Sequence, residues 1–197
     1  DITVVSNAVR PPMGIEGKEH ITVSQKLYYN PNPNLSVLVY GSSFFMNTYD
    51  LIQDMTFSQA RDWTAGTKVT YHVKDWFSVT GSLHADFYDR FKRHERIDKR
   101  QKDYESSIYQ PRLTVTSNYF NGHSLILGME HTSDELTSDR FSGNANHDLK
   151  TRALKETEYF LQDEWTINPR WMISVGIRTN FSKAFGFMGM PKVAAKY

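Results

Sequence analysis

Three residues with catalytic potential occupy alternate positions of one short stretch: Ser82, His84 and Asp86. A hydroxyl, an imidazole and a carboxylate are the groups of a nucleophilic triad. In a strand, alternate side chains point the same way at intervals of roughly 7 Å, whereas a proton relay needs contacts of about 3 Å. The spacing therefore excludes a relay, and the sequence has no nucleophile elbow or phosphate-binding loop. We expect no catalytic residue and predict that the chain is not an enzyme.

Two histidines are of a type that binds metal ions or haem. His72 and His84 fall on the polar side of two consecutive strand candidates. If the hairpin between these strands has a three-residue loop, Gly66 rather than His72 lies across from His84, so the imidazoles are not close. The chain has no cysteine, which excludes thiolate metal sites. We therefore predict no metal site and no cofactor, with both histidines as polar residues of a strand face.

A polar segment, Thr132–Lys150, is predicted to be a long connector. His131 precedes it, His147 lies near its end, and it contains Asp134 and Asp139. Such groups could ligate a cation or contact an iron chelate, although the spacing is not that of a calcium loop. A solvated loop is the simpler interpretation, and these four residues are candidate ligand contacts.

The most basic stretch covers residues 92–102 and reads K-R-H-E-R-I-D-K-R-Q-K. On a nuclear protein it would suggest that the chain binds nucleic acid, but the net charge of +1 does not indicate such a partner. The stretch falls in another predicted connector. Arg93 and Arg96 are therefore candidate contacts for an anionic ligand or for lipopolysaccharide phosphates, and we predict no nucleic-acid partner.

The elements that position these side chains are predicted to be strands, because apolar and polar residues alternate. The apolar face comprises Trp63, Val69, Tyr71, Phe77, Val79, Leu83, Leu113, Val115, Leu125, Leu127, Trp171, Ile173 and Val175. The opposite face carries the candidate lumen-facing residues Lys68, His84, Asp86, Arg112, Glu130 and Arg178. One residue conflicts with the pattern. Asp163 shares its phase with Leu161 and Trp165, which places a carboxylate on the apolar face unless a bulge shifts the phase.

Short and long connectors are predicted to alternate. Turns are expected near positions 32, 75, 122 and 169, and long polar connectors at about 47–60, 91–107, 133–155 and 182–190. The apolar faces of two hairpin strands coincide only if the loop has an odd number of residues. Three predicted three-residue loops satisfy this condition: Lys74-Asp75-Trp76, Asn121-Gly122-His123 and Asn168-Pro169-Arg170. This layout is typical of an up-and-down outer-membrane barrel with short periplasmic turns and longer outer loops.

Composition agrees with such a barrel. The 197 residues are 39% hydrophobic with a mean hydropathy of −0.56, and no apolar run is long enough for a membrane-spanning helix. A barrel strand needs no such run, because only every second residue faces lipid. Asp1–Arg10 lacks the regions of a signal peptide, and we expect a processed or excised piece. The predicted fold class is all-β, with nine or ten antiparallel up-and-down strands over residues 1–197 forming part of a large transmembrane β-barrel.

The last fifth of the chain resembles a known family. Its pieces are Y-F-L-Q-D-E-W from Tyr159, W-M-I-S-V-G-I-R-T-N-F-S from Trp171 and P-K-V-A-A-K-Y from Pro191. In this order they are similar to consecutive barrel strands of TonB-dependent outer-membrane receptors. The resemblance implies active uptake of a scarce solute, such as a ferric siderophore, haem or cobalamin, through a barrel in the bacterial outer membrane. It also implies an N-terminal plug domain that contacts TonB; neither the plug nor the C-terminal barrel strand is expected within these residues.

Two other interpretations remain at this point. A passive porin, or a small barrel complete in itself, would show the same alternation. A soluble β-sandwich that binds a ligand would direct its apolar face toward a protein core instead of lipid. The lengths of the strands and the asymmetry of the connectors favour lipid.

Overall fold

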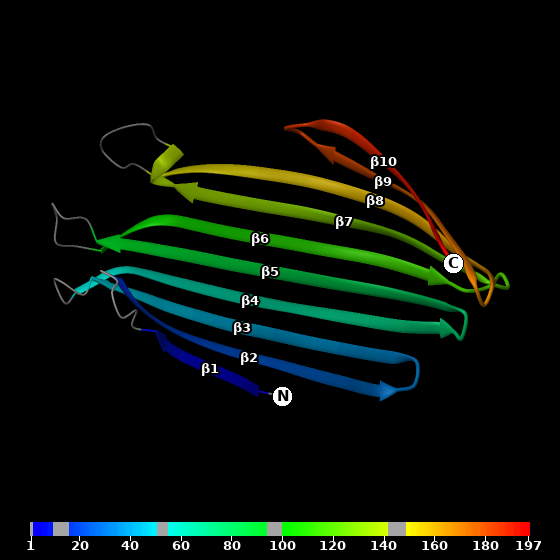
Figure 1. Ribbon diagram of the computed structural model, residues 1–197, viewed down its shortest axis with the longest axis horizontal. Coiled ribbons are helices and arrows are strands. Elements are labelled where there is room, and N and C mark those ends of the chain that lie inside the picture. The colour runs from blue at the N-terminus through cyan, green and yellow to red at the C-terminus, as the bar shows by residue number, and fades with distance from the viewer. Residues whose placement is uncertain (1, 10–15, 51–54, 94–99, 142–148) are drawn as a thin grey trace.

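The computed structural model describes residues 2–9, 16–50, 55–93, 100–141 and 149–197. These residues form ten strands that pair in sequence order as one antiparallel sheet (Figure 1). The strands are β1 (Ile2–Val9), β2 (Glu16–Asn32), β3 (Leu35–Asp50), β4 (Met55–Lys74), β5 (Phe77–Arg93), β6 (Arg100–Ser117), β7 (His123–Ser138), β8 (Lys150–Asn168), β9 (Trp171–Ser182) and β10 (Gly186–Lys196). A short 3₁₀ helix, η1 (Asp139–Phe141), follows β7. The predicted all-β, up-and-down antiparallel fold is confirmed.

The short hairpins keep the apolar faces together, as the parity argument predicts. Tyr71 pairs with Val79, Val115 with Leu127, and Leu161 with Ile177. The loop lengths differ from the prediction. The turns at Asp75-Trp76 and Pro169-Arg170 have two residues, and a bulge next to each turn shifts the register by one. The third connector is longer, because β6 ends at Ser117 and β7 begins at His123. A two-residue turn and one bulged residue together make three residues, so the number of residues between the paired positions stays odd, as the parity argument requires.

Side chains and one glycine fix the geometry of these turns. Asn168 Oδ1 accepts hydrogen bonds from the backbone N–H groups of Arg170 (2.9 Å) and Trp171 (3.1 Å), as an Asx turn does. Gly122 has a φ of +77°, and a Cβ there would lie 2.7 Å from the Thr166 carbonyl oxygen. That carbonyl belongs to the neighbouring hairpin, whose Thr166 N–H donates to the Gly122 carbonyl over 2.7 Å. Adjacent short turns are thus joined in a row.

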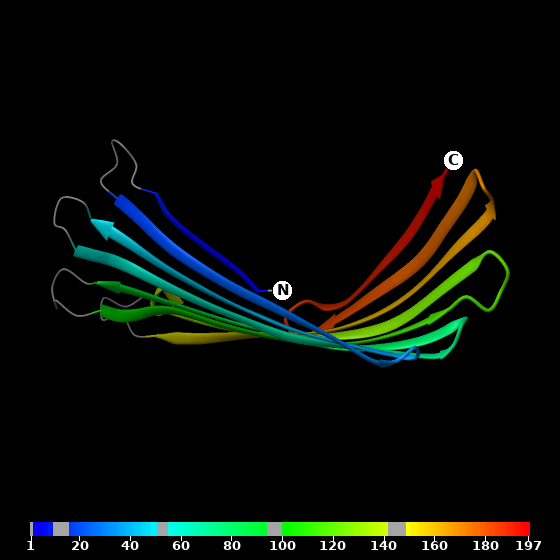
Figure 2. The same ribbon diagram turned by 90° about the horizontal axis from the view of Figure 1, so that it is seen from below.

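The sheet is bent into a trough, with β1 and β10 rising on the same side (Figure 2). Side chains on the two faces differ in crowding. Trp63, Leu83 and Leu127 on the apolar face are 58%, 46% and 52% exposed. Polar-face residues such as Asp86 and Glu130 are less exposed and make many of the contacts between side chains. Because side chains converge on the inside of a bend and spread on its outside, the polar face is the concave one.

The apolar band on the convex face has the height of a membrane. On β5 it runs from Phe77 to Phe87, about 34 Å along the strand at 3.4 Å per residue. At the tilt of 35–45° found in barrels, this length spans about 25 Å, the height of a lipid-facing band. Beyond the band the convex face becomes charged, with Arg61 on β4 and Asp89 on β5.

The predicted long connectors are wrong in extent. Residues 47–50 and 55–60 are strand, as are 91–93, 100–107, 133–138 and 150–155, and the predicted connector at 182–190 is a turn of only Lys183, Ala184 and Phe185. The sequence pattern failed there for a physical reason. Beyond the apolar band both faces of a strand carry polar side chains, so the alternation disappears while the backbone pairing continues.

The sandwich interpretation is wrong, because the described residues form one sheet and no second layer covers it. Among these residues, Ala60 is the one buried apolar side chain, at 1% exposure. The small closed barrel is not observed either. β1 and β10 are the two edges of the described sheet and do not pair with each other (Figure 2). No helix in the described part of the chain is both long and apolar enough to cross a membrane.

Candidate functional site

The concave face gathers all six residues predicted to face a lumen. The register places Lys68, His84, Asp86, Arg112, Glu130 and Arg178 on this one face of β4 to β9. Gly66 is the β4 partner of His84, as predicted, and His72 pairs with Ser78 instead. Their role in lining a passage stays a prediction, but the face on which they lie is clear.

On the concave face, one aromatic ring lies between two arginines, in a cluster built from the four strands β6 to β9. Phe160 on β8 lies 4.8 Å from the Arg112 guanidinium and 5.9 Å from that of Arg178. Each arginine also contacts a carboxylate: Arg112 Nη1 lies 3.4 Å from Glu130 Oε2, and Arg178 Nε lies 3.3 Å from Glu158 Oε1. We call these five residues the Arg–Phe–Arg cluster. Its two positive and two negative charges balance, so it is a neutral polar surface with cation–π contacts at its centre.

A glycine makes room for this ring. Gly128 on β7 pairs with Phe160, and a Cβ at Gly128 would lie 2.2 Å from the Phe160 ring and 2.8 Å from the Leu113 carbonyl oxygen. The same arrangement recurs three strands away. Tyr40 on β3 crosses Gly66 on β4, where a Cβ would lie 2.3 Å from the Tyr40 ring.

Tyr40 connects this second arrangement to a predicted site residue. Its hydroxyl lies 3.0 Å from Nδ1 of His84 on β5, beyond the glycine. Thr64 and Asp86 lie two residues from Gly66 and His84 on the same strands, and Thr64 Oγ1 donates to Asp86 Oδ2 over 2.8 Å. Hydrogen bonds across three strands therefore fix both His84 and Asp86.

A hollow of about 470 Å³ lies nearer the end of the strands that carries η1 and the long connectors. It is lined by Asp62, Asp86, Tyr88, Arg90, Tyr104 and Ser106. The Arg90 guanidinium lies 5.4 Å from the Tyr104 ring, and the Tyr88 and Tyr104 rings meet edge to face at 5.5 Å. Burial, and after it the neighbouring Asp86 carboxylate, raises the pKa of Asp62, which lies just beyond the apolar band. The hollow thus offers two phenol rings, a cation and two carboxyl groups.

A bulge positions the cation of this hollow. Asp103 on β6 has no partner in the register, which shifts between Arg90 and Phe91. The bulged carboxylate is almost fully buried and accepts from Arg90 Nε (3.2 Å) and Nη2 (2.9 Å), with Lys92 Nζ at 3.6 Å. The guanidinium is therefore clamped against Tyr104 at the edge of the hollow.

The structure describes four of the six predicted loop ligands, and His131 and Asp134 among them lie on opposite faces of the sheet. His131 and Asp134 lie in β7 and not in a loop, so that part of the prediction is wrong. His131 is on the convex face, bound to Thr157 Oγ1 at 2.9 Å, whereas Asp134 is on the concave face. Asp139 begins η1, and Arg93 is the last residue of β5. Arg96 and His147 lie outside the described residues, and ligand binding by this set stays a prediction. No group of three His, Asp or Glu residues in the described ranges could hold a metal ion.

Asp163 keeps its phase on the convex face, without a local bulge. Its Oδ2 lies 2.8 Å from Nδ1 of His123, and the His123 ring stacks on Trp165 at 5.3 Å with an angle of 9°. A partner from the adjacent strand therefore binds one oxygen of this carboxylate near the short turns, whereas Oδ1 is buried without a hydrogen-bond partner. Aromatic residues gather at that end: Trp76 contacts Tyr119 at 4.9 Å, and Trp171 contacts Tyr197 at 4.8 Å. They form a row like the interfacial girdle of a membrane barrel.

Comparison with known proteins agrees with this geometry. The sequence model of the family described as TonB dependent receptor-like, beta-barrel, matches residues 16–197. No curated protein sequence matches the chain.

Solved structures share the fold at low sequence identity. A variant of the ferric enterobactin receptor PfeA of Pseudomonas aeruginosa is 13% identical with a TM-score of 0.79, over 96% of this chain and 33% of that chain. The siderophore receptor PirA of Acinetobacter baumannii is 12% identical with a TM-score of 0.72, over 91% and 31%. The ferric citrate transporter FecA is 10% identical with a TM-score of 0.68, over 98% and 35%. The chain thus spans about a third of the length of these structures.

The family match extends over nearly the whole chain and agrees with the trough, its apolar outer face and its polar inner face. The chain belongs to the TonB-dependent receptor-like β-barrel family, whose members are outer-membrane proteins.

Proposed function

We propose that the chain forms one side of the barrel wall of an outer-membrane receptor that takes up a ferric siderophore with energy delivered by TonB. The observation that carries this proposal is the family match over residues 16–197 of a sheet with one apolar and one polar face. The chain itself supplies wall and contact surface, and it carries no catalytic step. TonB would act through a plug domain enclosed by the complete barrel.

The names of the similar structures support a ferric chelate over haem or cobalamin. They are described as ferric enterobactin, siderophore and ferric citrate receptors or transporters. The concave hollow beside Arg90 has suitable chemistry for such a solute. Tyr88 and Tyr104 line it with aromatic rings, which suit an aromatic or flat chelate.

Transport by the complete receptor provides the test. Cells that lack the receptor would be supplied with the receptor gene on a plasmid, and uptake of radioactive iron would be measured with ferric enterobactin, ferric citrate and haem. We expect uptake of at least one ferric chelate that stops when TonB is deleted or the proton gradient is dissipated. Uptake that continues without TonB, together with steady conductance in a planar bilayer, would indicate a passive pore instead.

Fractionation gives an independent check. We expect the receptor in the outer-membrane fraction, with a folded form that migrates differently from the heated form in denaturing gels. A receptor found in the soluble fraction would contradict the assignment of the convex face to lipid.

A further inference from the structure

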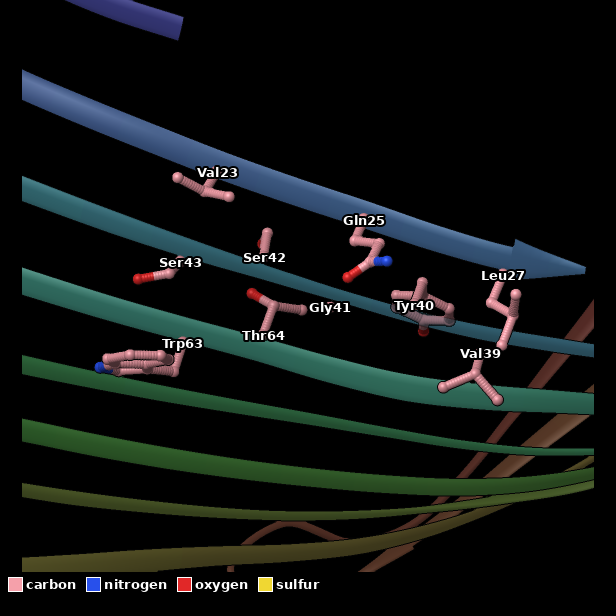
Figure 3. Close-up of a pocket in the computed structure, with 10 residues that line it drawn as sticks. All are labelled: Val23, Gln25, Leu27, Val39, Tyr40, Gly41, Ser42, Ser43, Trp63 and Thr64. Atoms are coloured by element: carbon pink, nitrogen blue, oxygen red, sulfur yellow. The ribbon is translucent and has the colours of Figure 1, made fainter. Parts of the chain in front are cut away.

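A shallow furrow crosses the convex face over β3 (Figure 3). Its lining residues come from three adjacent strands and comprise Val23, Gln25 and Leu27 of β2, Val39 to Ser43 of β3, and Trp63 and Thr64 of β4. The register sets them in rows: Val23, Ser43 and Trp63 form one row, and Leu27 and Val39 belong to another. The hollow has a volume of about 470 Å³.

Small residues in the central strand create the furrow. Ser43 lies between Val23 of β2 and the Trp63 indole of β4. Gly41 lies between Gln25 of β2 and the small Ala65 of β4. Val39 lies at one end of the furrow and the row of Val23, Ser43 and Trp63 lies toward the other, four residue steps or about 14 Å along β3. The result is an elongated depression along a strand, which suits an extended chain better than a compact ligand.

The lining is uncharged, and the furrow lies within the apolar band. Atoms that line an empty depression lose dispersion contacts, so a flexible hydrocarbon chain gains more here than on a smooth wall. A charged occupant would find no oppositely charged partner among the lining side chains.

A cation lies on the same face, two residues beyond one end of the furrow. Arg61 is two residues from Trp63 on β4, and its guanidinium lies 6.0 Å from the Phe45 ring and 5.5 Å from the Phe91 ring. It donates a hydrogen bond to the neutral Gln59 Oε1 over 3.3 Å. Among the described residues, no carboxylate lies within 4.0 Å of it.

The nearest carboxylate in the register is already paired. Asp89 is the β5 partner of Arg61, but Lys102 Nζ holds its Oδ1 at 2.7 Å and also contacts Glu105 at 3.2 Å. The guanidinium therefore keeps its charge and most of its five donors for an external anion. It lies just above the apolar band, at the depth where a lipid headgroup begins.

We propose that the furrow is a specific lipid site, in which one acyl chain lies along Gly41 and Ser43 and the phosphate of the same lipid binds Arg61. The inference rests on the proposed outer-membrane placement and adds a lipid of defined chemistry: an apolar chain with an anionic phosphate headgroup. The uncharged furrow and the unpaired cation beyond its end complement the two parts of such a molecule.

Native mass spectrometry of the complete receptor in detergent tests this. Dimyristoylphosphatidic acid is titrated in, and dimyristoylglycerol, which has the same chains and no phosphate, is the ligand control. We expect one phosphatidic acid to bind more tightly than any further copies, with an affinity at least about tenfold above that of diacylglycerol, because hydrogen bonds between a guanidinium and a phosphate are charge-assisted.

Variants separate the two halves of the site. Ser43→Leu fills the furrow and Arg61→Gln removes the charge, and each is expected to weaken binding of phosphatidic acid about tenfold or more. Arg61→Lys keeps a cation and is expected to retain most of the affinity. Gly81→Leu adds the same side chain to the same apolar band on β5, where a Cβ meets no atom within 4 Å, and is expected to leave binding unchanged.

Each outcome decides the proposal. Equal affinities for the two lipids, or equal affinities in Ser43→Leu, Arg61→Gln and Gly81→Leu, would overturn it and show only adventitious annular lipid. A co-purified polypeptide lost on Ser43→Leu would overturn it in favour of a protein partner. If Ser43→Leu does not assemble, the affinities of Arg61→Gln and Arg61→Lys for phosphatidic acid still test the proposal, and equal affinities would overturn it. A receptor that retains detergent and lipid without a preferred site refutes only this inference, whereas a soluble receptor refutes the proposed function as well.

Discussion

Replacing Gly128 with alanine is expected to destabilise the barrel, although alanine is usually the better strand residue. The new Cβ would lie 2.2 Å from the Phe160 ring and 2.8 Å from the Leu113 carbonyl oxygen. The ring can rotate away, but the backbone carbonyl is fixed by the pairing of β6 with β7. The strands must therefore separate slightly as well.

The magnitude follows from three contributions. Overpacking costs about 1–3 kcal/mol, and displacing Phe160 from Arg112 and Arg178 loses cation–π contacts of about 0.5–1 kcal/mol each. Alanine recovers about 0.5–1 kcal/mol, because glycine loses more backbone entropy on folding. The expected net loss is about 1–4.5 kcal/mol, a shift of roughly 5- to 2,000-fold in the ratio of folded to unfolded barrel.

Urea unfolding of the complete receptor in detergent micelles, followed by tryptophan fluorescence, measures this loss. Gly81→Ala is the matched control, since its Cβ meets nothing within 4 Å, and it is expected to be neutral or stabilising by up to about 1 kcal/mol. Phe160→Ala combined with Gly128→Ala is expected to cost less than the sum of the single variants. If Gly128→Ala and Gly81→Ala change the unfolding free energy equally, the account of an aromatic ring seated on Gly128 is refuted.

Three further outcomes are expected. Asp103→Asn breaks the paired hydrogen bonds to Arg90 and should lower the unfolding free energy by about 2 kcal/mol. Glu105→Gln, at an exposed residue of the same strand, should lower it by less than about 0.5 kcal/mol. Equal losses in the same urea assay would contradict the role of the bulge. Asn168→Ala removes the acceptor of two turn N–H groups and should cost about 1 kcal/mol, while Asn168→Asp should keep most of the stability; proteolysis at this turn gives a second measure. The hydrogen bond from Lys102 to Asp89 raises the pKa of this lysine above its ordinary 10.5, so its stabilising contribution should be complete below pH 10.5 and disappear as the pH rises through the folded-state pKa. The stability difference between wild type and Lys102→Gln should therefore stay constant near neutral pH and shrink above pH 10.5, and a difference that grows at high pH would reverse the assignment.

The alternation of side chains predicted the faces of the strands correctly wherever a strand lies in the lipid band. Phe77 to Phe87 on β5 and Trp171 to Ile177 on β9 place their apolar residues on one side, as the sequence indicates. Beyond the band, the prediction of connectors failed at residues 55–60 and 100–107, which are strand. Polar side chains on both faces remove the pattern but not the backbone hydrogen bonds, so sequence periodicity reports the surroundings of a strand and not its length.

The candidate site was predicted in part. The position of Gly66 opposite His84 followed from the parity of a short hairpin, and it is confirmed. The contacts of Phe160 and Tyr40 were missed, although each is an aromatic residue in the polar phase of its strand. A glycine in the same phase on a neighbouring strand was the available signal.

What the sequence by itself determined is the phase of each strand and the pairing of strands joined by short turns. Both depend on local geometry: side chains alternate with a period of two, and a tight turn admits few registers. Only the tertiary structure decided the pairings closed by the longer connectors, such as Gly41 with Ala65 and Gly128 with Phe160. The length of a flexible connector does not fix the register of the strands that it joins, so the Arg–Phe–Arg cluster and the convex furrow follow from packing across the whole sheet.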